Sequence, residues 1–356
     1  MLDFFEIDFL DIDSNKSGDA IAIRYQIDNK IYIHLVDGGF LDTGNKIIEH
    51  VNNYYSNPEF IDYVVVTHPD GDHANGLRKI LEEFEVGQLW MLRPWLYVDE
   101  LIDRFSRFRS KDNLARRLKE IYPNIEALEK IAQDNDIAIF EPFQGERIGG
   151  FTVIAPTKER YLDLIVESEK TPESSTQSIK SSRKIFMGQV VSFMRSLWGQ
   201  ETFSSQETSA ENNMSVIQFA RLNDFDILLT GDAGRDALLE AADYAPQIGL
   251  ELPGVDYFQI PHHGSRRNVS TEVLDRWLGE RLHSQPRDDE ETFIGIVSAA
   301  KEDEDHPRKA VVRAVIHRGA KVISTEGIDV RIGKDAPERE GWVSATPLPY
   351  PTEQEK

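Results

Sequence analysis

The sequence predicts an α/β protein, and three observations lead to this prediction. Short apolar runs typical of strands recur along the chain, and amphipathic stretches with helical spacing lie between them. Candidate strands occur in both halves rather than in one block. The chain has 356 residues, of which 40% are hydrophobic, so it could form one large domain or two of average size.

The first half of the chain begins with apolar runs that we interpret as strands. The runs end in polar or Gly-rich turns, and segments with helical spacing separate the later ones. Strands are expected over Phe4–Leu10, Asp19–Tyr25, Ile31–Val36, 62–67 and 87–92, with helices over Gly44–Tyr54 and 74–85.

The middle of the chain has a different composition. Residues 95–135 are charged and read as helical, and a strand pair is expected near 137–155. Residues 157–210 are rich in Ser, Thr, Glu and Gln, and 167–176 resemble a flexible loop. Within this region Ile179–Trp198 is amphipathic, which predicts a helix packed on the domain. A lid or a partner-binding helix is the alternative.

Strand and helix signals return in the last third of the chain. Strands are expected over Met214–Phe219, Phe225–Thr230, Val255–Ile260, Phe293–Ser298 and Lys321–Ser324, and helices over 235–243 and Lys309–Arg318.

Composition narrows the classes of function. The absence of cysteine excludes disulfides and thiolate metal ligands. A formal net charge of −22 argues against general binding of polyanions, because such binding normally needs a basic face. No run of 18 apolar residues is present, and the N-terminus is acidic where a signal peptide would be basic. We therefore expect a cytoplasmic protein that does not associate with a membrane.

The most informative motif is His68-Pro69-Asp70-Gly71-Asp72-His73, which directly follows an apolar run. Four potential metal ligands, His68, Asp70, Asp72 and His73, fall within six positions. Imidazole and carboxylate groups are the ligands that hold Zn, Mn or Fe. A strand end would fix the backbone, and the turn would direct successive side chains into one volume.

Other predicted strands also end in candidate ligands. Asp37, Asp232 and the pair His262 and His263 each lie where an apolar strand runs into a Gly-containing turn. Glycine at such turns lets the backbone approach a metal or a substrate closely. A carboxylate such as Asp232 can bridge two cations, and cations about 3.5–4 Å apart suit phosphate-ester hydrolysis.

Six motifs in this order resemble the metallo-beta-lactamase superfamily, and most closely the soluble hydrolase domain of bacterial DNA-uptake competence proteins. The resemblance covers about residues 4–92, 137–156 and 212–330. The matching motifs are Phe9-Leu10-Asp11 with Gly18-Asp19-Ala20-Ile21, Val36-Asp37-Gly38-Gly39, Thr67–Leu77, Asn212–Val216, Leu228–Ala233 and His262–Ser265. It implies a single domain over residues 1–356 with an αββα sandwich and a helical insertion at about 95–210.

The resemblance also implies a ligand set for two divalent metal ions. His68, Asp70 and Asp232 would hold the first, and Asp72, His73, Asp232 and either His262 or His263 the second, with His263 preferred. Asp37 would orient the metal loop without touching a metal. Two departures matter: Asp70 stands where the family usually has His, and no His lies between 73 and 262, where Asn213 is nearest. Oxygen ligands favour Mn²⁺ or Mg²⁺ over Zn²⁺.

Residues beyond the ligands complete the predicted site. His306 precedes Pro307 after an acidic run and resembles a late His-Pro of the family, so it is expected at the substrate or beside the metal loop. The alternative is a residue that only begins a helix. Ser265, Arg266 and Arg267 could anchor a phosphate, since Arg binds phosphate oxygens bidentately, or form a solvated turn.

The sequence therefore favours a metal-dependent hydrolase that cleaves phosphodiesters of nucleic acid through a hydroxide activated by two metal ions. Asp72 and His306 are the expected catalytic residues, and residues 95–210 could bind a partner protein. One alternative is a hydrolase of small phosphodiesters or cyclic nucleotides, which the net charge favours. The other is a metal-binding protein with a degenerate site that acts with a partner.

Overall fold

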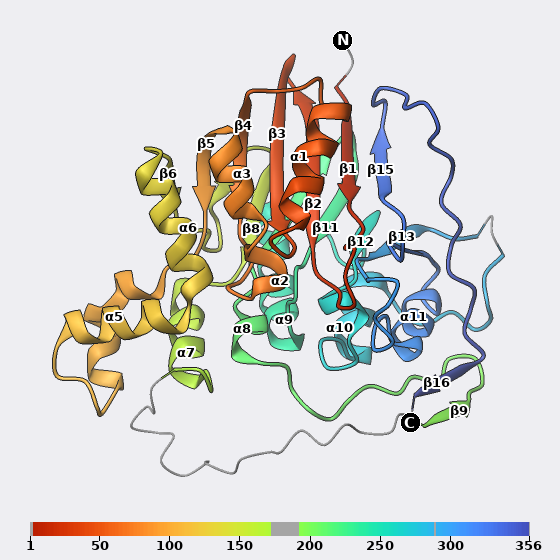
Figure 1. Ribbon diagram of the computed structural model, residues 1–356. Coiled ribbons are helices and arrows are strands. Elements are labelled where there is room, and N and C mark those ends of the chain that lie inside the picture. The colour runs from red at the N-terminus through yellow and green to blue at the C-terminus, as the bar shows by residue number, and fades with distance from the viewer. Residues whose placement is uncertain (1–2, 172–191, 288–289, 356) are drawn as a thin grey trace.

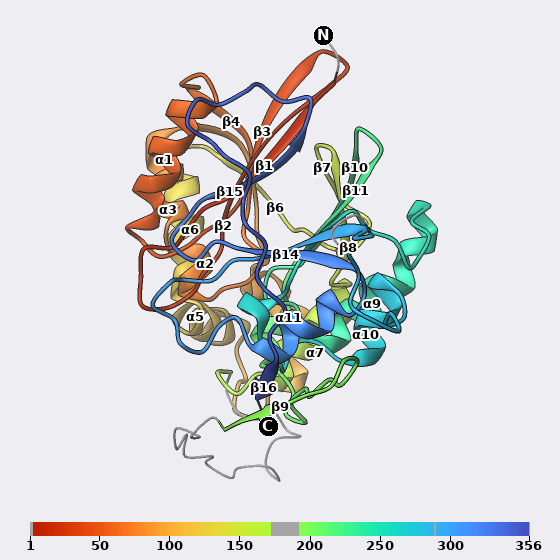
Figure 2. The ribbon, with the colours of Figure 1, turned by 90° about the vertical axis from the view of Figure 1, so that its right-hand side faces the viewer.

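Two large mixed sheets face each other and are flanked by helices on their outer sides, in the computed structural model of the chain (Figures 1 and 2). The structure describes residues 3–171, 192–287 and 290–355. This arrangement is the expected αββα sandwich. Among the described residues, no helix is long and apolar enough to cross a membrane.

The first sheet contains seven strands in the order β15-β1-β2-β3-β4-β5-β6. Strands β15, β1, β2 and β3 are antiparallel, whereas β3 to β6 run parallel. Their bounds are β1 Phe5–Phe9, β2 Ala20–Ile27, β3 Lys30–Gly38, β4 Phe60–Val65, β5 Glu85–Trp90, β6 Ala138–Phe140 and β15 Val330–Lys334.

The second sheet repeats this plan with the order β14-β13-β12-β11-β10-β8-β7. Its antiparallel part leads into a parallel part that runs from β11 to β14. The bounds are β7 Arg147–Ile148, β8 Phe151–Ala155, β10 Ile217–Leu222, β11 Phe225–Leu229, β12 Tyr257–Gln259, β13 Phe293–Val297 and β14 Ala320–Ser324.

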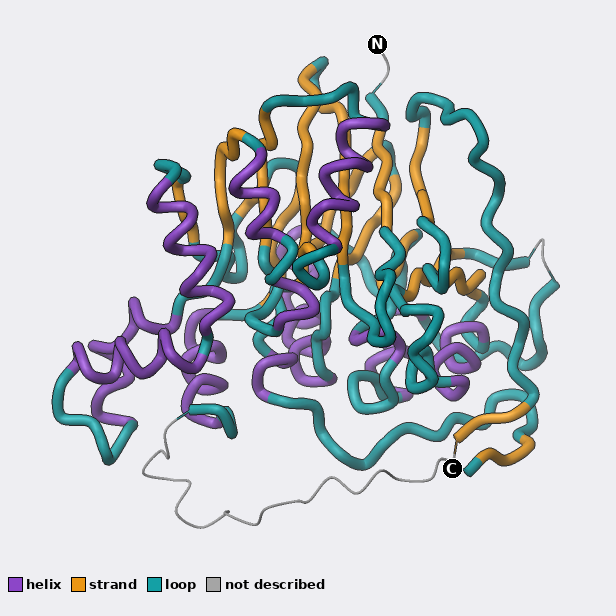
Figure 3. The backbone as a smooth tube through the Cα atoms, viewed as in Figure 1, coloured by secondary structure: helices purple, strands orange, loops and turns teal. Residues whose placement is uncertain are grey.

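Helices cover the outer face of each sheet, and a separate group stands at one end of the molecule (Figures 1 and 3). The first sheet is covered by α1 Thr43–Tyr54, α2 Gly71–Ala74, α3 Leu77–Glu83 and α6 Pro123–Asp134. The second is covered by α9 Arg235–Tyr244, α10 Thr271–Leu278 and α11 Lys309–Ile316. The remaining helices of the described residues are η1 Pro94–Tyr97, α4 Val98–Leu101, η2 Ile102–Arg104, α5 Lys111–Ile121, α7 Lys158–Glu167, α8 Ala210–Asn213, η4 Ala245–Ile248 and η5 His262–Gly264.

Most predicted elements form close to their expected bounds, and the differences have local causes. The expected helix 74–85 forms over Leu77–Glu83 as α3, and the short helix α2 ends before it at Ala74, because the chain turns at Asn75-Gly76, where Gly76 packs directly against the backbone of Gly38. Residues 214–216 precede β10 rather than belong to it, since the N–H of Val216 bonds to the carbonyl of Thr67. The predicted amphipathic helix Ile179–Trp198 lies partly outside the described residues.

The described end of that stretch is a strand, not a helix. β9 Phe193–Arg195 pairs with β16 Glu353–Glu355 near the C-terminus. Arg313 of α11 is buried beneath this pair and donates hydrogen bonds to the carbonyls of Leu197 and Pro351. Arg313 thus ties the segments around β9 and β16 to α11.

Candidate metal centre

The predicted ligands meet at one place because they follow the carboxyl ends of parallel strands in both sheets. Asp37 ends β3, and the His68–His73 loop follows β4 in the first sheet. Asp232 follows β11, and His262 and His263 follow β12, in the second. In open α/β sheets, binding sites form outside the carboxyl ends of the strands.

Asp37 organises the loop of the first sheet. Its Oδ1 accepts the N–H of Thr67 at 2.8 Å, and its Oδ2 accepts the Thr67 hydroxyl at 2.6 Å. The same Oδ2 lies 2.7 Å from Nδ1 of His73. Asp37 has a φ of 56°, a conformation that costs energy for a residue other than glycine and is typical of functional sites.

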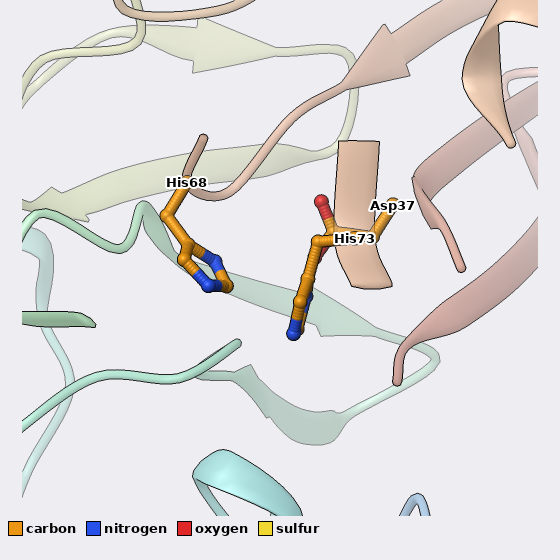
Figure 4. Close-up of side chains that lie close together, drawn as sticks. All are labelled: Asp37, His68 and His73. Carbon is orange, nitrogen blue, oxygen red and sulfur yellow. The ribbon is translucent and has the colours of Figure 1, made fainter. Parts of the chain in front are cut away.

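His68 and His73 direct their rings to the same side of the site (Figure 4). The carboxylate of Asp37 can only accept, so Nδ1 of His73 carries the proton it shares. The Thr67 hydroxyl donates to Asp37 and therefore accepts from Nδ1 of His68, at 3.0 Å. Both rings thus have a protonated Nδ1, which leaves Nε2 free to bind a cation.

His262 and His263 are held in the same way from the second sheet. Nδ1 of His263 donates to the carbonyl of Ser298 at 2.9 Å. Nδ1 of His262 lies 2.9 Å from Oδ1 of Asn268 and 2.9 Å from Nδ2 of Asn212, so two amide side chains hold this ring nitrogen. Both histidines have positive φ values, 49° and 55°.

Asp232 lies at the centre of the four rings. Its Oδ1 is 3.3 Å from Nε2 of His73 and 3.7 Å from Nε2 of His263. Its Oδ2 is 3.6 Å from Nε2 of His68 and 3.5 Å from Nε2 of His262. Two ligands of one tetrahedral Zn²⁺ lie about 3.4 Å apart when each is about 2.1 Å from the ion. The donors therefore form two groups, each with two imidazoles and one oxygen of Asp232.

Buried atoms without a hydrogen-bond partner show that this donor set suits cations. Nε2 of His68, His73 and His263 and Oδ1 of Asp232 are buried and have no such partner. An unpaired polar atom in this position is costly unless something binds it. Imidazole nitrogens and carboxylates without thiolates match Zn²⁺ or Mn²⁺. The residues thus fit the divalent ions that the predicted site requires.

The protonation of the histidines also favours a bound cation. Burial lowers the pKa of His68, and lowers that of His263 to about 3, so both rings are neutral ligands. Burial would also lower the pKa of His73, but Asp232 and Asp37 outweigh it and raise that pKa well above its usual value. These carboxylates attract a positive charge to Nε2 of His73, whether a proton or a metal ion.

Part of the chain matches a known protein family. Residues 23–148, which include β3, β4 and the His68–His73 loop, match the model of the metallo-beta-lactamase superfamily. None of the curated protein sequences compared with the chain gives a match.

Several solved structures resemble the chain at low identity. The hydrolase AbOPH of the beta lactamase superfamily is 14% identical with a TM-score of 0.30, over 60% of this chain and 56% of that one. CmlA, a diiron beta-hydroxylase from Streptomyces venezuelae, is 12% identical with a TM-score of 0.34, over 90% and 44%. A diphosphatase of the PhnP family is 10% identical with a TM-score of 0.34, over 93% and 99%. The chain spans about half the length of the first two.

The two aspartates of the His68–His73 loop have different surroundings. Asp72 lies with His73 and His263 in a group whose donor atoms are all within 4.8 Å of one another. Asp70 belongs to no such group among the described residues, and its Oδ1 instead lies 2.7 Å from Nζ of Lys170. Burial raises the pKa of Asp70, but His68 and Lys170 outweigh it and lower this pKa overall.

Asn213 and residues 265–267 have contacts of their own within the fold, and the predicted phosphate binding by residues 265–267 stays a prediction. The side chain of Asn213 packs against Gly234, whereas the amide of its neighbour Asn212 lies 2.9 Å from Nδ1 of His262. Successive residues of α8 point in directions about 100° apart, so only one of the two can face the histidine. Ser265 is buried, and its Oγ accepts the N–H of Arg267. Burial lowers the pKa of Arg266.

His306 lies beside the centre, near the two histidines of the second sheet. Its ring is stacked on His262, with ring centroids 5.8 Å apart, and lies 6.0 Å from His263. Nδ1 of His306 is 3.2 Å from Oδ2 of Asp303, which also accepts the N–H and hydroxyl of Ser17. His306 is therefore a partly exposed histidine whose orientation a carboxylate fixes.

Asp19 is a member of the centre that its position in the sequence did not reveal as a ligand. It is fully buried, and its donor atoms group with those of His73 and Asp232. Its Oδ2 accepts from Gln259, whose other amide atom accepts the N–H groups of Thr230 and Gly231. Burial, opposed by His73, raises the pKa of Asp19 to about 7. Its only sequence signal was the Gly18-Asp19 motif of the family resemblance.

Proposed function

We propose that the chain is a metal-dependent hydrolase that cleaves phosphodiesters. The observation that carries this proposal is the set of four Nε2 atoms around Asp232, each on a ring whose Nδ1 is already engaged. Members of the metallo-beta-lactamase superfamily are mostly metal-dependent hydrolases. Divalent cations held by such donors polarise a phosphoryl oxygen and make water nucleophilic at neutral pH.

The residues of the chain would divide the work of hydrolysis among them. Asp232 and the four histidines would hold the cations, and Asp37 orients His73 and Thr67. Asp72, beside His73 and His263, completes the second group of donors. His306 uses Nδ1 to bond Asp303, which leaves Nε2 to protonate the departing oxygen of the substrate.

Nucleic acid is the first substrate that we propose. The support comes from the motifs that resemble the competence-protein hydrolase domain, including Asn212–Val216 and His262–Ser265. The chain carries a net charge of −22, which repels nucleic acid. This substrate therefore requires the bound metal ions to neutralise the phosphates locally.

Small phosphodiesters or cyclic nucleotides are a second candidate, and the charges around the centre favour them. Lys170 is paired with Asp70, and Arg308 is paired with Asp305. A groove that follows a nucleic-acid backbone normally presents cations that are available for phosphates. A small ligand could be held by the metal ions alone.

The test is hydrolysis by metal-stripped protein refilled with Zn²⁺, Mn²⁺ or Mg²⁺. The substrates are bis-p-nitrophenyl phosphate, single- and double-stranded DNA, RNA and cyclic dinucleotides, with Asp72→Ala as the control. Cleavage of a polynucleotide that Asp72→Ala abolishes supports the nuclease, and turnover of small diesters alone supports the second candidate. Binding of about two metal ions per chain without any turnover would instead indicate a metal-binding protein that acts with a partner.

A further inference from the structure

Lys170 brings a positive charge from the insertion to the metal loop. Its Nζ lies 2.7 Å from Oδ1 of Asp70, although the two residues are 100 positions apart. The side chains are 46% and 35% exposed, so the pair is open to solvent, unlike the buried rings of His68 and His73. Lys170 follows α7, whose sequence gives no sign of contact with the loop.

A buried turn fixes the position of this lysine. Ser168 is fully buried, and its Oγ forms a short hydrogen bond with Oε1 of Glu211, a buried residue of α8. The same Oγ accepts the N–H of Lys170, and the hydroxyl of Thr171 donates to the carbonyl of Ser168. The backbone of Lys170 is therefore held by side chains on both sides, and its ammonium group is directed to Asp70.

Asp70 occupies the ligand position at which the chain departs from the common pattern of the superfamily. The structure groups His68, His262 and Oδ2 of Asp232 on the side of the first metal, while Asp70 forms an ion pair with Lys170. A carboxylate that is bonded to an ammonium group has less negative charge to offer a cation. The second group consists of Asp72, His73 and His263.

We propose that Lys170 is a resident counter-ion of Asp70 that weakens the first metal site relative to the second. A divalent ion that uses Asp70 must displace the ammonium group or bind beside it, and both outcomes lower affinity. The two metal positions are thus unequal, and the insertion sets the difference. This inference rests on the metal-binding part of the proposed function and not on the nature of the substrate.

The experiment is calorimetric titration of metal-stripped protein with Mn²⁺, together with the metal content after dialysis. Lys170→Met removes the charge, and Lys170→Arg keeps it. Lys158→Met is the matched control, because Lys158 also lies in the insertion and forms an ion pair of 2.7 Å with similar exposure, to Glu100. None of these side chains is buried, and the thermal unfolding of each variant establishes that it folds.

The wild-type protein should bind one Mn²⁺ tightly and a second more weakly. Lys170→Met should tighten the weaker step by up to about fivefold, the upper end of the change expected when an exposed ion pair is removed, and Lys170→Arg and Lys158→Met should not. Two equal steps in the wild-type protein, or an unchanged second step in Lys170→Met, would overturn the proposal for Lys170 alone. An absence of Mn²⁺ binding in every variant would overturn it together with the proposed hydrolase.

Discussion

At the scale of single residues, the four histidines differ in the group that holds Nδ1. It is a carboxylate for His73, a hydroxyl for His68, an amide for His262 and a backbone carbonyl for His263. A carboxylate makes the opposite nitrogen the most basic, so His73 should be the strongest metal ligand of the four. We therefore expect Asp37 to raise metal affinity through its hydrogen bond to His73.

Replacement of Asp37 by Asn should test this role. Asn tolerates the left-handed backbone of position 37 but cannot accept hydrogen bonds with both of its side-chain atoms. Metal affinity should fall about 10- to 100-fold, as measured by competition with a chelating dye. The exposed Asp42→Asn is the control, and an affinity equal to that of the wild-type protein would contradict the role of Asp37.

His306 should affect turnover but not metal content. Since its ring lies beside His262 and is oriented by Asp303, loss of the imidazole in His306→Ala should lower kcat about 10²- to 10⁴-fold. Metal content, measured by mass spectrometry after dialysis, should stay as in the wild-type protein. A reduced metal content would instead make His306 a ligand.

From the sequence, we could predict only those residues of the site that directly follow strands. His68, His73, Asp232 and His263 stand directly after apolar runs, where the chain must turn. Asn268 and Ser298 orient histidines from positions whose sequence is ordinary, so only the folded chain shows their part. The prediction for Asn213 was one residue away from Asn212, a difference that decides which side of a helix faces the site.

At the scale of elements, α11 depends on a residue near the end of the chain. The carboxylate of Glu355 accepts the N–H groups of Lys309 and Ala310, which begin the helix and would otherwise lack acceptors. Glu355 itself belongs to β16 and is buried. The helix that follows His306 and Pro307 is thus capped from a distant strand.

Removal of this cap should destabilise the protein measurably. Glu355→Ala should lower the free energy of unfolding by about 1–2 kcal/mol, the usual cost of losing an N-terminal cap. Urea unfolding followed by circular dichroism measures the change. Glu353→Ala on the same strand is the control, and equal losses in the two variants would contradict capping as the cause.

Elements that pair over long distances were the hardest to predict. β15 joins the first sheet beside β1, and β16 pairs with β9, although neither has a long apolar run. α10 was also missed, although Ser270 caps it and its apolar residues have helical spacing. Short elements of this kind are stabilised mainly by their neighbours in the fold rather than by local propensity.

At the scale of the whole molecule, a buried charge network joins segments on the second sheet. Glu201 is hydrogen-bonded to His317 and Arg318, and Arg318 is also paired with Asp275 of α10. Burial alone would raise the pKa of Glu201, but the bonds from His317 and Arg318 outweigh it and lower this pKa to about 2.

This network predicts how stability depends on pH. Because the folded-state pKa of Glu201 lies below its ordinary value of 4.5, its contribution is fully present above pH 4.5 and is lost as the pH falls toward 2. Glu201→Gln should remove about 3 kcal/mol at neutral pH and flatten the acid side of the stability profile. Urea unfolding at pH 3, 4.5 and 7 measures this, with the exposed Glu207→Gln as the control. A constant difference between Glu201→Gln and the wild-type protein at all three pH values would contradict it.

Metal binding should also stabilise the molecule as a whole. An ion that binds only the folded state raises the free energy of unfolding by about 2.7 kcal/mol when its concentration is 100 times its Kd. The melting temperature should therefore rise with Mn²⁺, and the rise should be smaller for His263→Ala. A melting temperature that does not respond to Mn²⁺ would contradict cation binding at this centre.

The two sheets each hold half of the metal centre. Thr67 of the first sheet packs against Gly231 of the second, where a side chain would collide with it, and Asp19 is bonded across to Gln259. Neither half of the chain carries a full set of donors. Cations bound at Asp232 would therefore link the two sheets directly. If the chain is cut between the two halves, the fragments should bind metal only when they reassemble. The affinity for cations would then report how closely the two sheets are associated.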